Sequence, residues 1–257
     1  MLTRYEYLLR NSEALNYRMS SLFHGALMEL LPSDYVEALH ISQLHPFSQH
    51  LERRNNEWFW VLNTLTEKDD EVFRNALKDV RIIELRKHNI TLGLELHQTQ
   101  QMDDSELKEI FYSGEEESFF QVRFLTPVSF KRNGSYLIYP DLFCIFQSLM
   151  NMQDAVEDRG YMDQDTLDEL VEHSKIVRYK LDSTYFYLEG VKIPSFIGSI
   201  TIRMTGTSTM KRFAKMLFTF GEYSGVGIKT SLGMGAIALE KEDNKSGIKR
   251  RSGEQES

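Results

Sequence analysis

The spacing of hydrophobic and polar positions changes from element to element along the first hundred residues. Residues 2–9 have the composition of a strand, and between 17 and 31 apolar residues recur at helical spacing until Pro32 ends the helix. A short helical piece then runs towards His40. Residues 47–53 and 58–65 predict a hairpin, Thr66 opens a capped helix, and 90–98 alternate as a strand does. The predicted order is β-α-β-β-α-β.

The same order begins again after a polar, acidic stretch. Strands are predicted at 119–125, 176–188, 193–204 and 234–239, with one helix opening at Pro140-Asp141 and another spanning 210–220. The chain is therefore predicted to be α+β, with two tandem ferredoxin-like (β-α-β-β-α-β) domains and a C-terminal glycine-rich loop. The predicted N-terminal domain is 1–100, the linker 101–117, the C-terminal domain 118–240 and the disordered polar tail 241–257.

The most specific local motif is the glycine-rich segment 225–235, Gly-Val-Gly-Ile-Lys-Thr-Ser-Leu-Gly-Met-Gly. It is no phosphate loop, because Ile228 separates Gly227 from Lys229, and no dinucleotide motif, because Thr230 stands where glycine is needed. Those motifs also lead from a strand into a helix, whereas this segment follows a helix. Its glycines, lysine and hydroxyls can follow a phosphodiester backbone. A tight helix-to-strand connection is the alternative.

Histidines are concentrated near the start of the chain. Four of the seven, His24, His40, His45 and His50, fall within 27 residues. A helix flank and the loop after the next helix can converge, and imidazoles there suit RNA cleavage by internal transesterification. A neutral histidine takes the 2′-hydroxyl proton, while a protonated group donates to the departing 5′-oxygen or steadies the phosphorane. Two alternatives stay open: a metal site, although no i, i+4 pair is present, and ordinary surface histidines.

Composition and charge bear on the partner and the compartment. The 257 residues carry a formal net charge of −8, which argues against nucleic acid. Between Lys175 and Lys229, however, nine basic residues stand against three acidic ones, so that segment is +6 and the remainder −14. One basic face on an acidic body is predicted, with solvated charged faces as the alternative. The single Cys144 excludes an internal disulfide, and the lack of a signal or membrane-spanning pattern predicts a cytoplasmic protein.

These features together resemble the CRISPR-associated endoribonucleases that process repeat RNA, the Cas-six family. The tandem pattern, a histidine in the first helix or the loop after it, and the terminal Gly-x-Gly-(five residues)-Gly-x-Gly loop carry the resemblance. Residues 220–235 are close to that family's C-terminal signature, and further matches are 22–25, 39–40, 45–48, 126–131 and 192–198. The chain looks most like members that serve type III, Csm-type systems.

The resemblance implies metal-independent cleavage of the precursor CRISPR transcript within each repeat, leaving a 2′,3′-cyclic phosphate and a 5′-hydroxyl, with no cofactor. By position, it makes His40 the general acid or base and His24 the group that orients the 2′-hydroxyl or serves as base. His45 falls where a lysine or arginine often stabilises the transition state. It implies RNA-binding residues at Lys180, Lys192, Ser195, Gly225, Gly227, Lys229, Thr230, Ser231 and Gly233.

The implied partner is CRISPR repeat RNA, and no membrane is involved. A type III effector complex is left open as a transient second partner. Two rival functions also stay open at this point: a non-catalytic repeat-RNA-binding subunit of a CRISPR effector complex, and a small-molecule-binding ferredoxin-like protein.

Overall fold

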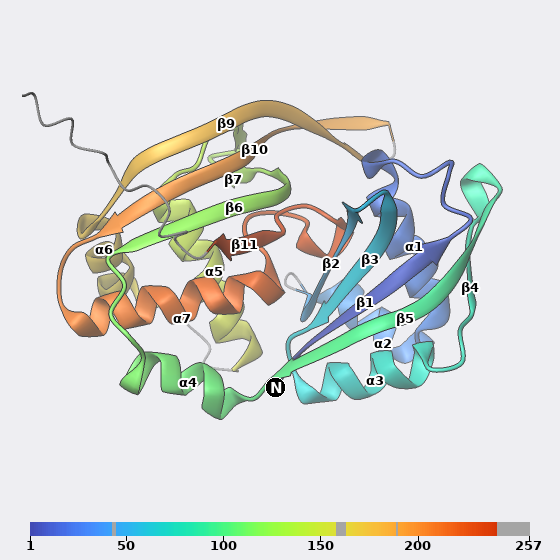
Figure 1. The fold of residues 1–257 in the computed structure, drawn as a ribbon, viewed down its shortest axis with the longest axis horizontal. Coiled ribbons are helices and arrows are strands. Elements are labelled where there is room, and N and C mark those ends of the chain that lie inside the picture. Colours follow the sequence, from blue (N-terminus) through green and yellow to red (C-terminus); the bar gives the residue numbers. More distant parts are fainter. Residues whose placement is uncertain (43–44, 158–162, 189, 241–257) are drawn as a thin grey trace, which may run out of the picture.

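Two antiparallel sheets dominate the computed structural model, which describes residues 1–42, 45–157, 163–188 and 190–240 (Figure 1). The N-terminal sheet has the strand order β2-β3-β1-β5-β4, from β1 (Leu2–Arg10), β2 (Phe47–Arg54), β3 (Glu57–Thr64), β4 (Ile82–Leu85) and β5 (Ile90–Met102). The C-terminal sheet has the order β11-β6-β10-β9, from β6 (Phe119–Val128), β9 (Ser174–Leu188), β10 (Val191–Met204) and β11 (Ile237–Glu240). A small hairpin, β7 (Phe130–Arg132) and β8 (Ser135–Leu137), stands apart.

Helices pack on one face of each sheet. The first sheet carries α1 (Ser20–Leu30), α2 (Ser33–Ile41) and α3 (Glu67–Leu77), and the second carries α5 (Leu142–Val156), α6 (Gln164–Glu172) and α7 (Ser208–Ser224) (Figure 1). The described residues also form three single 3-10 turns, η1 (Tyr17–Met19), η2 (Arg86–His88) and η3 (Thr230–Leu232). The predicted cap at Thr66 is confirmed, because its Oγ1 accepts the Asp69 amide at 3.1 Å.

The predicted α+β class with two antiparallel sheets is confirmed, but several short elements were missed. These are β4, β7, β8, α6 and α4 (Asp104–Ser113). The strands have three or four residues, too few to establish a period of two. The segment of α6 reads as an acidic run, yet Leu167 and Leu170 are buried at helical spacing. The predicted tail, 241–257, lies outside the described residues.

A third core joins the two halves. Each sheet has its own core beneath its helices, and a smaller cluster collects Leu2 from β1, Leu107 from α4, and Met216 and Phe220 from α7. Helix α4 lies in the segment predicted as a linker and packs along α7, where Arg212 Nε donates to the Phe111 carbonyl at 2.9 Å. Apolar burial therefore fixes one half against the other. None of the described helices is long and apolar enough to cross a membrane.

Candidate functional site

Two of the predicted catalytic histidines meet at η3, inside the glycine-rich segment. His24 Nδ1 lies 3.1 Å from the Ser231 carbonyl oxygen, and His45 Nδ1 lies 3.0 Å from the Ser231 hydroxyl. A carbonyl oxygen only accepts, so His24 Nδ1 carries the hydrogen and donates it. In the neutral ring, His24 Nε2 then holds a lone pair that is ready to accept a proton.

Ring packing holds these two imidazoles in parallel. The centroids of His24 and His45 are 6.1 Å apart at an interplanar angle of 9°. Both rings also stack near Phe47, at 6.0 and 5.7 Å, and Phe47 is fully buried at the start of β2. The orientation of each ring is therefore fixed by one polar contact to Ser231 and by one aromatic neighbour.

His40, the third predicted catalytic histidine, lies in the last turn of α2, where it is exposed. Burial, with smaller effects of charged His45 and His40, lowers the pKa of His24 to about 4, although the hydrogen bond to the Ser231 carbonyl opposes the shift. Burial also lowers the pKa of His45, opposed by the Leu39 carbonyl, and His40 adds to the lowering. Both buried rings are thus neutral near pH 7 before RNA binds. Neither then supplies the positive charge that the resemblance implied for His45.

His50 stands apart from this group. It is buried on β2, and neither ring nitrogen has a hydrogen-bond partner among the described residues; its Nε2 lies 3.9 Å from Glu52 Oε2. Burial lowers the pKa of His50 to about 3, while Glu52 opposes the shift. The fold therefore keeps His50 as a neutral ring.

Acidification from pH 7 to pH 5 is expected to destabilise the fold. His24 and His50 have a pKa of about 4 and 3 when folded, against about 6.5 when unfolded. The unfolded chain binds more protons between these values, so the stability is fully present above about pH 6.5 and is lost as pH falls. Circular dichroism melts at pH 7, 6 and 5 measure the effect. His50→Gln should flatten it, and a wild-type melting temperature that does not move with pH contradicts it.

The glycines of the loop serve close packing. The amide of Gly225 donates to the Gly221 carbonyl at 2.8 Å, and the amide of Gly227 donates to Ser148 Oγ at 2.8 Å. The amide of Gly233 donates to the Thr230 carbonyl at 3.3 Å. These three donors are used inside the protein, so the amide contacts to phosphate expected from Gly225, Gly227 and Gly233 are not available. At Gly233, with φ of +106°, a Cβ atom would collide with the Ser20 hydroxyl.

The other predicted RNA-binding residues differ in their access to solvent. Ser195 is fully buried on β10 and its hydroxyl donates to the Ile193 carbonyl at 2.9 Å, so its predicted contact with RNA is wrong for this structure. Thr230 and Ser231 are also buried. Lys229 is exposed at the left-handed N-cap of η3.

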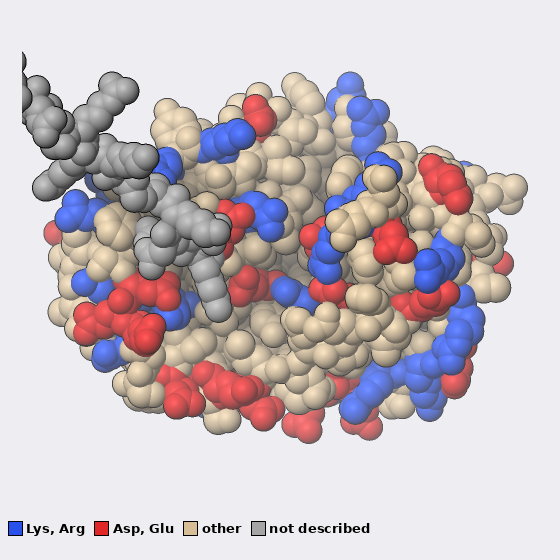
Figure 2. Space-filling model, viewed as in Figure 1, with Lys and Arg blue, Asp and Glu red and all other residues tan. Residues whose placement is uncertain are grey.

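Two predicted RNA-binding lysines are exposed on the second sheet. Lys192 lies on β10 beside Tyr187, and Lys180 on the edge strand β9 is seven residues from Tyr187, roughly 23 Å along the strand. One phosphate therefore cannot contact both lysines. Figure 2 shows basic side chains along β9 and β10 at the upper edge and acidic ones over α4 at the lower edge.

Ser231 is the residue whose role the sequence did not reveal. It was predicted to bind RNA, but it contacts two histidines that are 207 and 186 positions away in the chain. No local pattern reports such a contact.

Across the described ranges, no group of three or more His, Cys, Asp or Glu side chains is arranged to hold a metal ion. The arrangement instead presents one neutral imidazole with a free lone pair, a second neutral ring and an exposed third.

A family model and two curated relatives that match the sequence carry the same description. Residues 122–237 match the family model described as CRISPR-associated endoribonuclease Cas6. The chain is 44% identical over 223 residues to a CRISPR-associated endoribonuclease Cas6 of Streptococcus thermophilus, covering 85% of this chain and 90% of the relative. It is 34% identical over 220 residues to a protein of the same description from Mycobacterium tuberculosis, covering 84% and 70%.

Solved structures resemble the chain in fold. A Cas6 product complex superposes with a TM-score of 0.75 at 19% identity, covering 93% of this chain and all of the other. Thermus thermophilus Cas6 superposes with a TM-score of 0.69 at 20% identity, covering 93% and 98%.

Proposed function

The chain belongs to the CRISPR-associated endoribonuclease Cas6 family, and on that premise we propose that it cuts the precursor CRISPR transcript within each repeat by attack of a ribose 2′-hydroxyl. The observation that carries the proposal is the meeting of His24 and His45 at Ser231 of η3, with His40 exposed at the end of α2 and acting on the pKa of both rings. Each half also has the strand order fourth-first-third-second in its sheet, once the edge strand β4 is set aside. That order supports the assignment of two ferredoxin-like units.

In the proposed reaction, His24 acts first. Its Nε2 takes the proton of the 2′-hydroxyl, and the 2′-oxygen forms a bond to phosphorus while the bond from phosphorus to the 5′-oxygen breaks. His40, exposed and able to reach a bound RNA, gives a proton to the departing 5′-oxygen. The products are a 2′,3′-cyclic phosphate and a 5′-hydroxyl, and every proton is accounted for without a metal ion.

The negative charge of the transition state requires a different partner from neutral His45. Lys229, whose side chain ends in an ammonium group, is exposed two residues before Ser231. We assign to Lys229 the contact with the phosphate, and to His45 a polar contact within the same group. The RNA itself adds negative charge beside both buried rings, which raises their pKa once it binds and makes His24 Nε2 a stronger proton acceptor.

Incubation of the protein with a repeat RNA in excess chelator tests the proposal. We expect cleavage at one position, a cyclic phosphate on the upstream product, and no cleavage of a matched RNA that carries a single 2′-deoxy at that position. A strict need for metal, or cleavage of the deoxy RNA, overturns the mechanism. Tight binding without any cleavage would instead indicate a non-catalytic RNA-binding subunit. If the protein does not bind RNA at all, the result would indicate a protein that binds a small molecule.

A further inference from the structure

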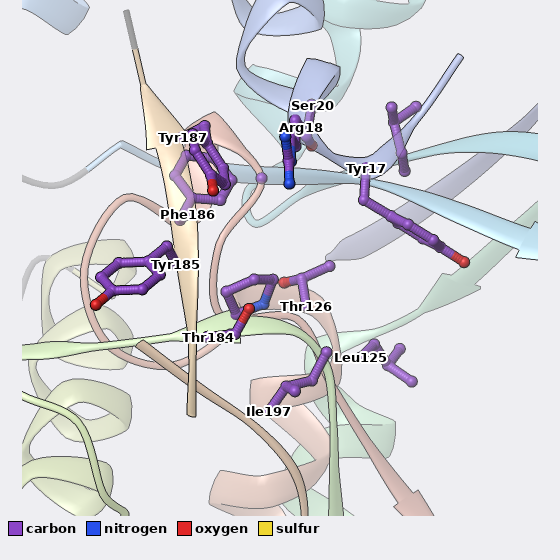
Figure 3. A pocket seen from close by; sticks show the side chains of 13 residues that line it. Tyr17, Arg18, Ser20, Leu125, Thr126, Thr184, Tyr185, Phe186, Tyr187 and Ile197 are labelled. Carbon is purple, nitrogen blue, oxygen red and sulfur yellow. The ribbon is translucent and has the colours of Figure 1, made fainter. Parts of the chain in front are cut away.

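A hollow of about 470 Å³ lies between the two halves and reaches the glycine-rich segment at Gly233 (Figure 3). Its walls come from η1, β2, β6, β9 and β10, and Gly233 closes one part of it. Apolar side chains line much of the surface, namely Leu51, Leu125, Pro127 and Ile197. Sites of this volume and lining hold small organic groups.

Flat side chains flank this hollow. The Arg18 guanidinium lies over the Tyr187 ring, 4.4 Å from its centroid, and Lys192 Nζ is 5.8 Å from the same centroid. Tyr17 stands on the other side of Arg18 in Figure 3, half exposed, with its ring set edge-on against Trp58 at 4.7 Å. Guanidinium planes and aromatic rings are the surfaces on which unpaired bases stack.

The charge around the hollow favours an anionic occupant. A second hollow, of about 340 Å³, shares Arg18 and Tyr187 and adds Lys87 and His88 from η2. None of the described residues that line these two hollows is an aspartate or glutamate, although the chain contains 38 of them. Cations beside an apolar floor match the phosphates and the base of a nucleotide.

The hollow is also close to the histidines. Ser20, which lines it, precedes His24 by one turn of α1, about 6 Å along the axis. Gly233, which also lines it, follows Ser231 by two residues. We propose that this hollow binds one unpaired nucleotide of the repeat RNA close to the cleaved phosphodiester, with its base stacked against Arg18 and Tyr187. The proposal rests on the proposed function, because it supposes that repeat RNA reaches His24.

Binding of repeat RNAs with single missing bases tests this site. Each RNA carries a 2′-deoxy at the cleaved position and one abasic nucleotide, moved along the positions near the cut. With wild type, one abasic position is expected to weaken binding about 10-fold, as the loss of one stacked base does. Tyr187→Ala and Arg18→Ala should each weaken binding of the intact RNA to a similar extent. These two variants should bind the RNA that is abasic at that position no more weakly than they bind the intact RNA.

Two controls accompany the measurement. Tyr187→Phe keeps the ring and should bind as wild type, and Tyr112→Ala, which removes an exposed ring on α4, should change nothing. Circular dichroism first shows that both alanine variants are folded. The proposal fails if both variants bind intact RNA as wild type does. It also fails if, at every abasic position, the loss of affinity caused by the variant adds fully to the loss caused by the missing base. Cleavage of unmodified repeat in chelator is followed in parallel. If it persists while the abasic pattern is absent, the nucleotide site is wrong and the proposed reaction stands.

Discussion

His40→Ala is expected to slow cleavage of repeat RNA by about 10²–10⁴-fold while leaving RNA affinity unchanged. The His40 ring is exposed at the end of α2, so its removal leaves no cavity in the core. When charged, it nevertheless lowers the pKa of both His24 and His45, so it interacts electrostatically with both buried rings. Without it, the departing 5′-oxygen has no proton donor from the cluster. Single-turnover rates at saturating enzyme, with affinities measured on 2′-deoxy RNA, separate the two quantities.

A matched histidine variant shows whether that loss is specific. His97 is exposed on β5 and touches Phe59, outside the group at η3. His97→Ala should therefore cleave at the wild-type rate. If His40→Ala cleaves equally fast, the proton donor lies elsewhere and the roles assigned to the three histidines are wrong.

Local patterns predicted most of the fold because they reflect burial. The helix opened by Thr66 buries Phe73 and Leu77 at helical spacing, whereas the strand containing Trp58 and Trp60 is buried on both faces and reads as a nearly continuous apolar run. Helix α4 was missed because Leu107 is its one buried residue, and its role depends on contacts with the distant α7. A pattern that needs a partner from another part of the chain is not visible in its own segment.

The candidate site was predictable only in part, for the same reason. His24, His40 and His45 are close in sequence and come from one helix pair and the connection that follows it. Ser231 joins them from the other half of the chain, and the low pKa of His24 arises from burial that no sequence pattern reports. Ser195 is different, since a signal was available. It lies two residues from buried Ile193 on the same strand, and that spacing points both side chains to the interior.

Gly233→Ala is expected to lower cleavage by about 100-fold or more and to destabilise the protein. Gly233 has φ of +106°, and a Cβ atom there would lie 2.7 Å from Ser20 Cβ as well as against its hydroxyl. Either η3 or the start of α1 must move. Ser231 lies two residues before Gly233, and His24 lies one turn after Ser20, so the movement separates the two partners of the His24–Ser231 hydrogen bond. A displacement of about 1 Å in a reacting group can cost 10²-fold in rate.

Gly134→Ala is the control that distinguishes the effect of the steric collision at Gly233 from the effect of left-handed backbone strain alone. Gly134 also has a left-handed φ, +79°, in the turn between β7 and β8, but a Cβ atom there meets nothing within 4 Å. It should cost about 1–2 kcal/mol of stability from the left-handed conformation, with cleavage unchanged. Melting temperatures and single-turnover rates compare the two variants. Equal rates for both would mean that the close approach of η3 to α1 does not order the histidines, and only a selective loss in Gly233→Ala supports that coupling.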